Sequence, residues 1–501
     1  MSDNTPLLRR GNVVLRADPS RVIAKLFLPG QELVAHGISR ADAVIQRALA
    51  LTEAEVGVTL ARVVQQFSQR HHDLEELFAE HFRLISHHVP GADSLSESRR
   101  QLIGAYCTQE FSVEAAALFN PSIVPHPDQR GLAPGELRFV MSVRAVGEGH
   151  ISSIEFRTGV LTSDTVVVDD PGSRLTTGRA YPSSMSRDFL RGALSDRPDR
   201  ATADPVLRGL RAHFTVNRLE QALASVQQDR LMGSSSDPII ERIREISAGH
   251  YSLTFRPDRP ISERVIYPTS AAERQGMEDA RFTRMVENDG SRIYYGTYTA
   301  FDGARISPRL IQTKDFQTFD VSQMIGPAAK DKGMALFPRR VGGRYQALSR
   351  WDRETIGVAS SPDARSWGDP VAVWRPGPPW ELIQLGNCGS PIETDAGWLV
   401  LTHGVGPMRT YEISAILLDL EDPTRLIGAL HEPLLTPDAD ERDGYVPNVV
   451  YSCGALVHDG TLIVPYGCSD SSIRFAFGDV AELLARMVSV SAATRQPASA
   501  G

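Results

Sequence analysis

Residues Gln275 to Gly303, QGMEDARFTRMVENDGSRIYYGTYTAFDG, are the segment most informative about the fold. Two adjacent carboxylates and an arginine open a strand-like run, which a glycine-containing turn separates from a second, aromatic run. Strand and turn signals in this order are typical of a β-hairpin. Taken alone, the charged start of the hairpin is an ion-paired turn. A functional role for these charges would require similar charged strand ends elsewhere in the chain.

Three segments further along the chain share the character of RIYYGTYTAFDG (292–303). Each joins a glycine-containing turn to a short strand that ends in polar or charged residues. They recur at intervals of roughly 50 residues, the spacing of propeller blades. We therefore predict a β-propeller for this part of the chain, with a β-sandwich as the alternative. The three segments are GGRYQALSRWD (342–352), AGWLVLTHGV (396–405) and GTLIVPYGCSD (460–470).

The earlier part of the chain has a different pattern. Apolar residues recur at helical spacing from Arg40 to Ile85, and residues 97–119 continue in that style. A further short helix is expected from Pro238 to Ala248. Two segments, HISSIEFRTGVL (150–161) and YSLTF (251–255), alternate as strands do. The sequence thus predicts helices early and strands late.

The chain has 501 residues, which is more than one ordinary core organises. We predict a mostly β protein, and specifically a five-bladed propeller, the number of blades coming from the family resemblance. Its expected parts are a mainly helical N-terminal accessory region over residues 1–200, a propeller domain over residues 201–487 and a disordered, small and polar tail over residues 488–501.

Charge and motif content exclude several classes of protein. A formal net charge of −8 argues against nucleic acid as a partner. No apolar run reaches the ~18 residues of a membrane span, and the first twenty residues lack the apolar core of a secretory signal. We therefore expect a cytoplasmic protein without a membrane partner. Phosphate-loop, dinucleotide-binding, zinc-hydrolase and nucleophile-elbow motifs do not occur, so neither a metal nor an organic cofactor is expected.

Polar and charged residues recur at the ends of the predicted strands. One such residue is usually part of a solvated turn, but recurrence at equivalent strand ends predicts a single shared cleft. Carboxylates, arginines and flat aromatic faces in one cleft suit a sugar. The residues are Glu278, Asp279, Arg281, Lys330, Asp331, Lys332, Arg350, Asp352, Trp380, Glu381, His403, Tyr411, Asp443, Asn448 and Asp470.

The segment from about Glu263 to Phe477 resembles glycoside hydrolase family 130, the β-mannoside phosphorylases and related β-mannosidases. The order and spacing of its motifs carry the resemblance, which does not cover the first 200 or so residues. The motifs are GMEDARFT with YGTYTAFDG, KDKGMALFPRRVGGRYQALSR, WELIQLGNCGSPIETDAGWLVLTHGV, YEISAILLDLEDPTRLIG, DGYVPNVVYSCGA and LIVPYGCSD.

The resemblance implies a five-bladed β-propeller that cleaves β-mannosides with inversion. In the family's phosphorylases inorganic phosphate, the co-substrate, attacks the anomeric carbon and releases α-mannose 1-phosphate, so a second carboxylate base is unnecessary. Asp279 of the EDxR motif is the implied acid, and its proton reaches the glycosidic oxygen through a mannose hydroxyl. The implied substrate is a β-linked manno-oligosaccharide or mannosyl conjugate. Relatives often form oligomers, so a homo-oligomer is expected.

The resemblance also distributes roles among the other candidates. The implied phosphate-binding residues are Arg281, Arg350, His403 and Tyr411. The expected substrate-binding residues are Glu278, Asp331, Trp380, Gln384, Asn448 and Asp470. Lys330 and Lys332 either attract phosphate or solvate a loop.

The chain departs from the family pattern at a few positions. Ala280 replaces the proline of EDPR, and Gln384 stands at or near a position where many phosphorylases carry a phosphate-binding lysine. Glu393 is an additional carboxylate that could serve as the base of a hydrolase. Because the other basic residues remain, we favour phosphorolysis, with an inverting β-mannoside hydrolase as the alternative and a non-catalytic carbohydrate-binding propeller as the weaker one.

Overall fold

The computed structural model describes residues 6–30, 33–34, 38–229 and 238–489. Its internal contacts divide the chain into two units. Unit 1 comprises Met1–Ala17, Ala116–Pro171 and Gly178–Gly501, and unit 2 comprises Asp18–Ala115 and Gly172–Thr177. No helix in the described ranges has the length and apolar composition that crossing a bilayer requires.

Unit 2 is mainly helical. The predicted helical stretch from Arg40 to Ile85 forms three helices. The side chains of Ser39 and Thr52 cap the first two, and the third follows Asp73, whose backbone is left-handed. Gly104 lets α4 approach α3 closely, since a Cβ there would collide with the backbone of Phe78. The elements are β3 (Val22–Leu26), β4 (Leu33–Val34), β5 (Ile38–Ser39), α1 (Arg40–Leu49), α2 (Glu53–Phe67), α3 (Leu74–Ile85), η2 (Ser86–His88), η3 (Ala92–Ser94), α4 (Glu97–Tyr106), β6 (Thr108–Ser112) and β11 (Thr176–Thr177).

Strands replace the helix that was expected to continue to residue 119. Helix α4 ends at Tyr106, and β6 then pairs with β3 along five residues. Strand β7 (Ala117–Pro125) follows and belongs to unit 1. Eight of its nine residues are buried, so the strand lacks the alternation that marks a half-exposed strand in a sequence.

Unit 1 is built from five antiparallel meanders, numbered here in chain order. The first is β7 (Ala117–Pro125), β8 (Leu137–Val146), β9 (Ser152–Leu161) and β10 (Val166–Val168), and the second is β17 (Gly276–Val286), β18 (Arg292–Phe301), β19 (Ile306–Thr313) and β20 (Thr318–Gln323). The third is β21 (Ala335–Leu336), β22 (Tyr345–Ser349), β23 (Ile356–Ser361) and β24 (Val371–Trp374). The fourth is β25 (Gln384–Asn387), β26 (Ile392–Thr394), β27 (Gly397–Val405), β28 (Tyr411–Leu418) and β29 (Leu426–Ala429). The fifth is β30 (Val450–Tyr451), β31 (Leu456–His458), β32 (Thr461–Cys468) and β33 (Ser472–Asp479).

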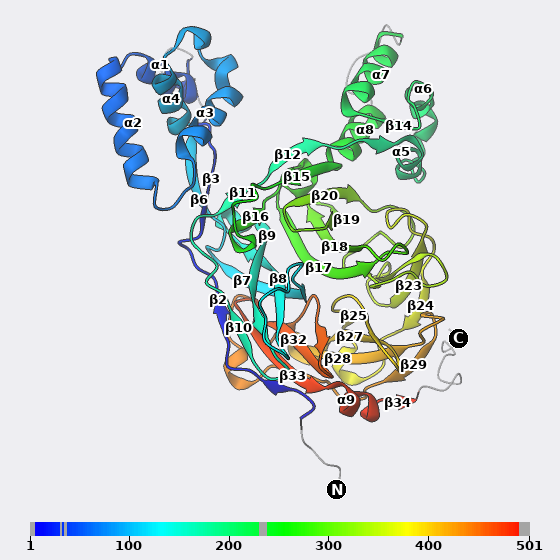
Figure 1. Cartoon of the computed structure of the whole chain (residues 1–501). Coiled ribbons are helices and arrows are strands. Elements are labelled where there is room, and N and C mark those ends of the chain that lie inside the picture. Colours follow the sequence, from blue (N-terminus) through cyan, green and yellow to red (C-terminus); the bar gives the residue numbers. More distant parts are fainter. Residues whose placement is uncertain (1–5, 31–32, 35–37, 230–237, 490–501) are drawn as a thin grey trace. The chain divides into compact units, whose positions relative to one another are not determined.

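Hydrophobic clusters join each meander to its neighbour. Each cluster combines buried side chains of two meanders, and Figure 1 shows the meanders of unit 1 one after another around a ring. The fifth meander shares a cluster with the first, so the packing returns to its start. Representative members, cluster by cluster, are Phe156 with Phe282, Leu310 with Leu336, Leu348 with Trp398, Leu399 with Val464, and Phe475 with Phe139.

The remaining elements of unit 1 extend these meanders. Strands β1 (Arg9–Arg10) and β2 (Leu15–Arg16) pair with β33, so the first strand of the described residues lies in the sheet of the fifth meander. Strand β16 (Arg264–Ile266) pairs with β9, and β34 (Val488–Ser489) pairs with β29. Helix α9 (Val480–Arg486) lies between β33 and β34 in the chain. The tail predicted to be disordered lies outside the described residues from residue 490 onward.

A helical segment with its own core is inserted between the first two meanders. Its outer strand β12 pairs with β15, which pairs with β20 of the second meander. The predicted helix from Pro238 to Ala248 is observed as α8. The elements are β12 (Arg179–Pro182), β13 (Met185–Ser186), α5 (Arg187–Ala193), η5 (Arg200–Ala203), α6 (Asp204–Arg208), β14 (His213–Phe214), α7 (Val216–Asp229), α8 (Pro238–Ala248) and β15 (Tyr251–Thr254).

The structure therefore divides the chain differently from the expected boundary at residue 200. The first meander, within residues 117–168, lies in unit 1 with the other four. The inserted segment interrupts the spacing of roughly 50 residues that revealed the later meanders. Because the interruption follows the first meander directly, this meander had no evenly spaced neighbour by which to recognise it.

Candidate active site

The EDAR motif lies at a β-bulge in β17. The pairing of β17 with β18 shifts register between Glu278 and Arg281, and Asp279 has φ 56°. A left-handed backbone is uncommon outside glycine, and aspartate tolerates it better than most residues. Neighbouring side chains in a regular strand point to opposite faces. At this bulge, however, the carboxylates of Glu278 and Asp279 both reach one guanidinium, that of Arg144 in β8.

Donors from several elements hold these two carboxylates. Arg144 donates from Nη2 to Glu278 Oε1 at 2.8 Å and from Nη1 to Asp279 Oδ1 at 3.3 Å. Asn120 Nδ2 donates to the same oxygen of Asp279 at 2.6 Å. Lys332 Nζ donates to Glu278 Oε2 at 2.5 Å, which places this lysine against a carboxylate rather than in a solvated loop. The motif is thus fixed by contacts with the first meander and with the loop before the third.

These contacts set the ionisation of Asp279. Burial by itself raises the pKa of a carboxyl, but the charges of Arg144, Arg281 and Lys332 and the hydrogen bond from Asn120 outweigh it. The pKa of Asp279 is therefore held well below its ordinary value. At neutral pH, in this arrangement, Asp279 is a carboxylate.

Asp470, in the turn between β32 and β33, shows the opposite behaviour. Burial raises its pKa to about 6, against the attraction of Arg144 and Arg409 and with the added repulsion of Asp279. Two carboxyls in one electrostatic environment thus have pKa values displaced in opposite directions. Such divergence is common where acid–base chemistry takes place.

Arg281 is buried, and its hydrogen-bond acceptors among the described residues are neutral oxygens. Its Nε reaches the carbonyl of Cys388 at 2.8 Å, its Nη1 the carbonyl of Asp279 at 2.8 Å and its Nη2 the hydroxyl of Tyr451 at 2.9 Å. Only 2% of its surface is exposed. Among the residues that the structure describes, no carboxylate group lies within ion-pair distance of this guanidinium.

Arg350 is a second buried arginine of the same kind. Its Nη1 lies 3.3 Å from Nε2 of His403, and no described carboxylate pairs with it. Burial, followed by the charges of Arg350 and Arg281, holds the pKa of His403 well below its ordinary value, so the ring is neutral and its Nε2 accepts. The rings of Tyr451 and Tyr411 lie beside His403, with centroids at 4.7 and 6.2 Å. The four residues predicted to bind phosphate therefore lie together.

Gln384 lies on the same face of the fourth meander as this basic group. Gly386 pairs with His403 across β25 and β27, and a Cβ on Gly386 would lie 2.6 Å from His403 Cε1 and 2.9 Å from Arg350 Nη1. Side chains two residues apart in a strand share a face. Gln384 therefore points to the side on which His403 and Arg350 lie, and the absence of a side chain at Gly386 leaves room for the arginine.

Asp331 and Asn448, predicted to bind sugar, lie in loops next to these strands. Asp331 is 8% exposed and has Arg353 Nε at 3.5 Å. Asn448 has φ 61°, and its carbonyl accepts from the backbone N of Tyr411 at 3.0 Å. The backbone of Asn448 thus fixes the start of β28, where a predicted phosphate-binding residue lies.

Trp380 packs on the strand that carries His403. It belongs to η8 (Pro379–Glu381), its Nε1 donates to the carbonyl of His431 at 3.2 Å, and its ring covers Gly404. The neighbouring Glu381 accepts from the backbone N of Gly377 at 2.9 Å, and burial raises its pKa to about 7. Trp380 is half-buried against this strand.

Glu393, the candidate base of a hydrolase, lies elsewhere. It pairs with Trp398 in the hairpin of β26 and β27, and Arg339 forms an ion pair with it at 2.8 Å. His403 lies five residues beyond Trp398 on β27, roughly 16 Å away at ~3.3 Å per residue. The structure therefore does not bring Glu393 to the EDAR motif.

Three residues of the cluster were missed by reasoning from the sequence. Asn120 and Arg144 lie in the first meander, inside the segment assigned to the helical accessory region, and Tyr451 lies at the end of β30. Asn120 and Arg144 carry sequence signals that could have identified them. Asn120 precedes a proline in an apolar run, and Arg144 is a lone charge in the apolar stretch FVMSVRAV.

Comparison with known proteins agrees with the motif order. The family model described as beta-1,4-mannooligosaccharide phosphorylase, Glyco_hydro_130, matches residues 258–488. A 1,2-beta-oligomannan phosphorylase of Thermoanaerobacter sp. is 34% identical over 236 residues, which are 46% of this chain and 75% of that protein. A beta-1,2-mannobiose phosphorylase of Listeria innocua is 33% identical over 243 residues, which are 47% of this chain. That alignment spans 64% of the Listeria protein, just under two thirds of its length.

Solved structures also align with this chain. The β-1,2-mannobiose phosphorylase of Listeria innocua in complex with β-1,2-mannobiose aligns over 75% of this chain and 92% of its own, with 24% identity and a TM-score of 0.44. A structure from work on GH130 glycoside hydrolases that target β-1,2-mannosidic linkages in Candida mannan aligns with 17% identity and a TM-score of 0.44. It covers 74% of this chain and 86% of its own.

Proposed function

This chain belongs to glycoside hydrolase family 130, and we propose that it cleaves β-mannosides by inverting phosphorolysis, releasing α-mannose 1-phosphate. Phosphate is then the co-substrate, and a β-linked manno-oligosaccharide is the substrate class. Relatives named as phosphorylases of β-1,2- and β-1,4-linked mannosides support this choice. We also propose that the five meanders are the blades of a five-bladed propeller, supported by the closed cycle of hydrophobic clusters.

The observation that carries the proposal is a pair of buried arginines that no carboxylate within the described part of the chain pairs with. Burying a charge is costly unless a partner compensates it, and Arg281 and Arg350 have only neutral acceptors among the described residues. An anion between them would supply the missing charge. Arginine forms bidentate hydrogen bonds with phosphate, so a phosphate is the anion that these side chains fit best.

In the proposed reaction Asp279 supplies the proton and phosphate supplies the nucleophile. Asp279 is ionised in the described arrangement, so it must gain a proton before it can act. A phosphate bound near Arg281 and Arg350 would offset part of the positive charge that lowers the pKa of Asp279. Phosphate binding would thus favour the acid form of Asp279, which ties proton donation to the presence of the nucleophile.

A phosphate-dependence assay tests the function. The protein is incubated with β-1,2- and β-1,4-mannobiose, with and without inorganic phosphate, and α-mannose 1-phosphate and free mannose are measured. The expected result is α-mannose 1-phosphate in the presence of phosphate only. Equal release of free mannose in phosphate-free buffer would support the hydrolase instead, and binding without turnover would support a carbohydrate-binding protein.

Gln384→Lys is expected to strengthen phosphate binding. The lysine would add a positive charge on the face that Arg350 and His403 occupy, and a charge-assisted hydrogen bond is worth about 1.5 kcal/mol or more, or about tenfold. The KM for phosphate should fall about tenfold in initial-rate measurements. Gln346→Lys, on β22, adds the same charge elsewhere and should leave that KM unchanged. An unchanged KM in Gln384→Lys would place the phosphate away from β25.

Glu393→Gln is expected to leave phosphorolysis unchanged within about twofold. The side chain is 43% exposed and paired with Arg339, and an exposed pair of this kind is worth about 0–1 kcal/mol. The measurement is kcat/KM for β-mannobiose at saturating phosphate. A hundredfold loss of kcat/KM would show that Glu393 acts in the reaction and would favour the hydrolase alternative.

A further inference from the structure

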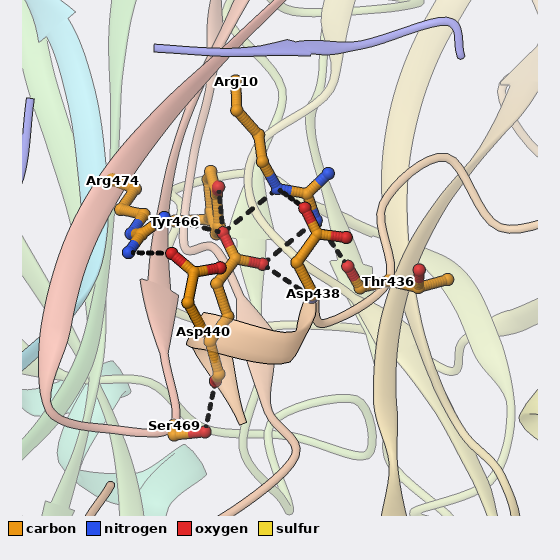
Figure 2. Close-up of polar contacts among 8 residues, drawn as sticks. Arg10, Thr436, Asp438, Asp440, Tyr466, Ser469 and Arg474 are labelled. Atoms are coloured by element: carbon orange, nitrogen blue, oxygen red, sulfur yellow. Dashed lines mark hydrogen bonds and ion pairs between the residues drawn. The ribbon is translucent and has the colours of Figure 1, made fainter. Parts of the chain in front are cut away.

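Glu441, in η10 (Ala439–Glu441) before the fifth meander, is a buried carboxylate at the centre of a polar cluster beside that meander. Its side chain has no exposed surface. Arg10 donates to it from Nε at 3.1 Å and from Nη2 at 3.0 Å, Tyr466 donates its hydroxyl at 2.7 Å, and the backbone N of Asp438 donates at 3.0 Å. Figure 2 shows the side chains of Arg10, Tyr466, Asp438 and Arg474 in this polar cluster.

The backbone of Glu441 is tied to the turn that carries Asp470. Its carbonyl accepts a hydrogen bond from Ser469 Oγ at 2.6 Å, and Figure 2 shows Ser469 at the lower edge of the cluster. Ser469 has φ 46° and Asp470 has φ 51°. Residues other than glycine adopt this conformation at a cost, so a specific contact must hold it. The bond from Ser469 Oγ is one such contact, beside the backbone bond from Val446 N to the carbonyl of Ser469 at 3.0 Å.

The same short helix, η10 (Ala439–Glu441), also fixes the loop of Asn448. The carbonyl of Arg442, its next residue, accepts from the backbone N of Asn448 at 3.1 Å. Ser469 donates its backbone N to the carbonyl of Val449 at 2.7 Å, which joins this loop to the turn of Asp470. The conformations of the Asn448 loop and of the Asp470 turn, both of which carry candidate substrate contacts, therefore depend on the segment around Glu441.

Net stability is a weak reason for burying this carboxylate. Removing both charges of a buried ion pair from water costs about as much as their attraction returns. Such a pair instead fixes the position of the buried residue, because every oxygen of Glu441 accepts a hydrogen bond from a specific donor. In this protein the fixed backbone lies directly against the turn of Asp470.

We infer that Glu441 is a positioning residue: held by Arg10 of the first strand, it fixes the Ser469 turn so that Asp470 stays beside Arg144 and Asp279. The role of Asp470 as a substrate contact rests on the proposed function. The positioning of the Asp470 turn by Glu441 does not depend on the proposed function. The positioning and the proposed function can therefore be disproved independently.

Ser469→Gly tests the inference without straining the fold. Glycine adopts φ 46° freely but lacks the hydroxyl that binds the carbonyl of Glu441. The expected result is a 10- to 100-fold fall in kcat/KM for the mannoside, because a displacement of ~1 Å can cost about 10²-fold. The KM for phosphate and the melting temperature should stay close to those of the wild type.

Asp440→Asn is the matched control. Asp440 pairs with Arg474 at 2.8 Å at the exposed edge of the cluster, with 66% of its side chain exposed, and does not contact Ser469. Its loss should leave the kinetic constants unchanged. Equal losses in Asp440→Asn and Ser469→Gly would show that the cluster is merely structural and would overturn the inference.

A carboxyl ¹³C NMR titration measures the pKa of Asp470, which reports its burial independently of enzymatic activity. The resonance is assigned with Asp470→Asn, and burial predicts a pKa of about 6 in the wild type. If Ser469→Gly releases the turn, Asp470 becomes hydrated and its pKa falls toward about 3.9. An unchanged titration would overturn the inference even in an active enzyme. A shifted titration in a protein without phosphorolysis would uphold the positioning and reject the proposed function.

Discussion

Asp279→Asn is expected to lower kcat/KM for phosphorolysis by about 10³-fold, within the range that general acids contribute. Asparagine has the shape of the aspartate but cannot donate an acidic proton. It also tolerates the left-handed backbone observed at this position, φ 56°, so the bulge should form as before. The measurement is the initial rate of α-mannose 1-phosphate release, with the melting temperature as a check on folding.

Asp289→Asn provides the matched comparison for this prediction. Asp289 lies in the hairpin turn that follows β17, and its carboxylate caps the backbone N of Ser291 at 2.9 Å. It is exposed, so the substitution should leave the rate unchanged. If Asp279→Asn kept both its rate and its affinity for mannoside, the acid would have to be sought elsewhere, with Asp470 as the first candidate.

Arg281→Met is expected to have the second large effect, on both activity and stability. Two buried acceptors, Cys388 O and Tyr451 Oη, and the partly buried Asp279 O lose their donor, and each unsatisfied buried group costs about 1–3 kcal/mol. The free energy of unfolding should fall by about 3 kcal/mol in denaturant titrations. Phosphorolysis should fall at least about 10²-fold at a fixed phosphate concentration, because one of the two proposed phosphate-binding guanidinium groups is gone.

Arg292→Met separates this effect from the simple loss of an arginine. Arg292 begins β18, pairs with Val286 across the hairpin and is exposed. Its replacement should change neither property. Phosphate-dependent turnover that persists at the wild-type level in folded Arg281→Met would reject the proposed anion site.

The sequence predicted the later meanders because their glycine turns are evenly spaced. RIYYGTYTAFDG, GGRYQALSRWD, AGWLVLTHGV and GTLIVPYGCSD correspond to β18, β22, β27 and β32, the same kind of strand in four successive meanders. The helices α1, α2 and α3 and the helix α8 were also predicted, because their apolar faces repeat regularly. Regular spacing was the decisive signal in both cases.

The site residues that the sequence did not predict were missed for the same reason, because the predictions relied on local signals. The contacts of Asn120 and Arg144 with Asp279 join residues 159 and 135 positions apart, across the inserted helical segment. No pattern along the chain records which distant residues meet. Glu393 shows the converse: it lies within a motif segment, but four residues of β27 separate its partner Trp398 from His403. Proximity in sequence was a poor guide there.

The pairing of the first strand with β33 has a consequence for synthesis of the chain. Arg10 and its partner Glu441 are 431 residues apart, so at about 5–20 residues per second the ribosome needs roughly 20–90 seconds to supply the second after the first. During that interval the edge strand has no sheet to join. The fifth meander, and with it the turn of Asp470, can adopt its final form only after most of the chain has emerged. Catalytic competence should therefore appear as a late, all-or-none step of biogenesis.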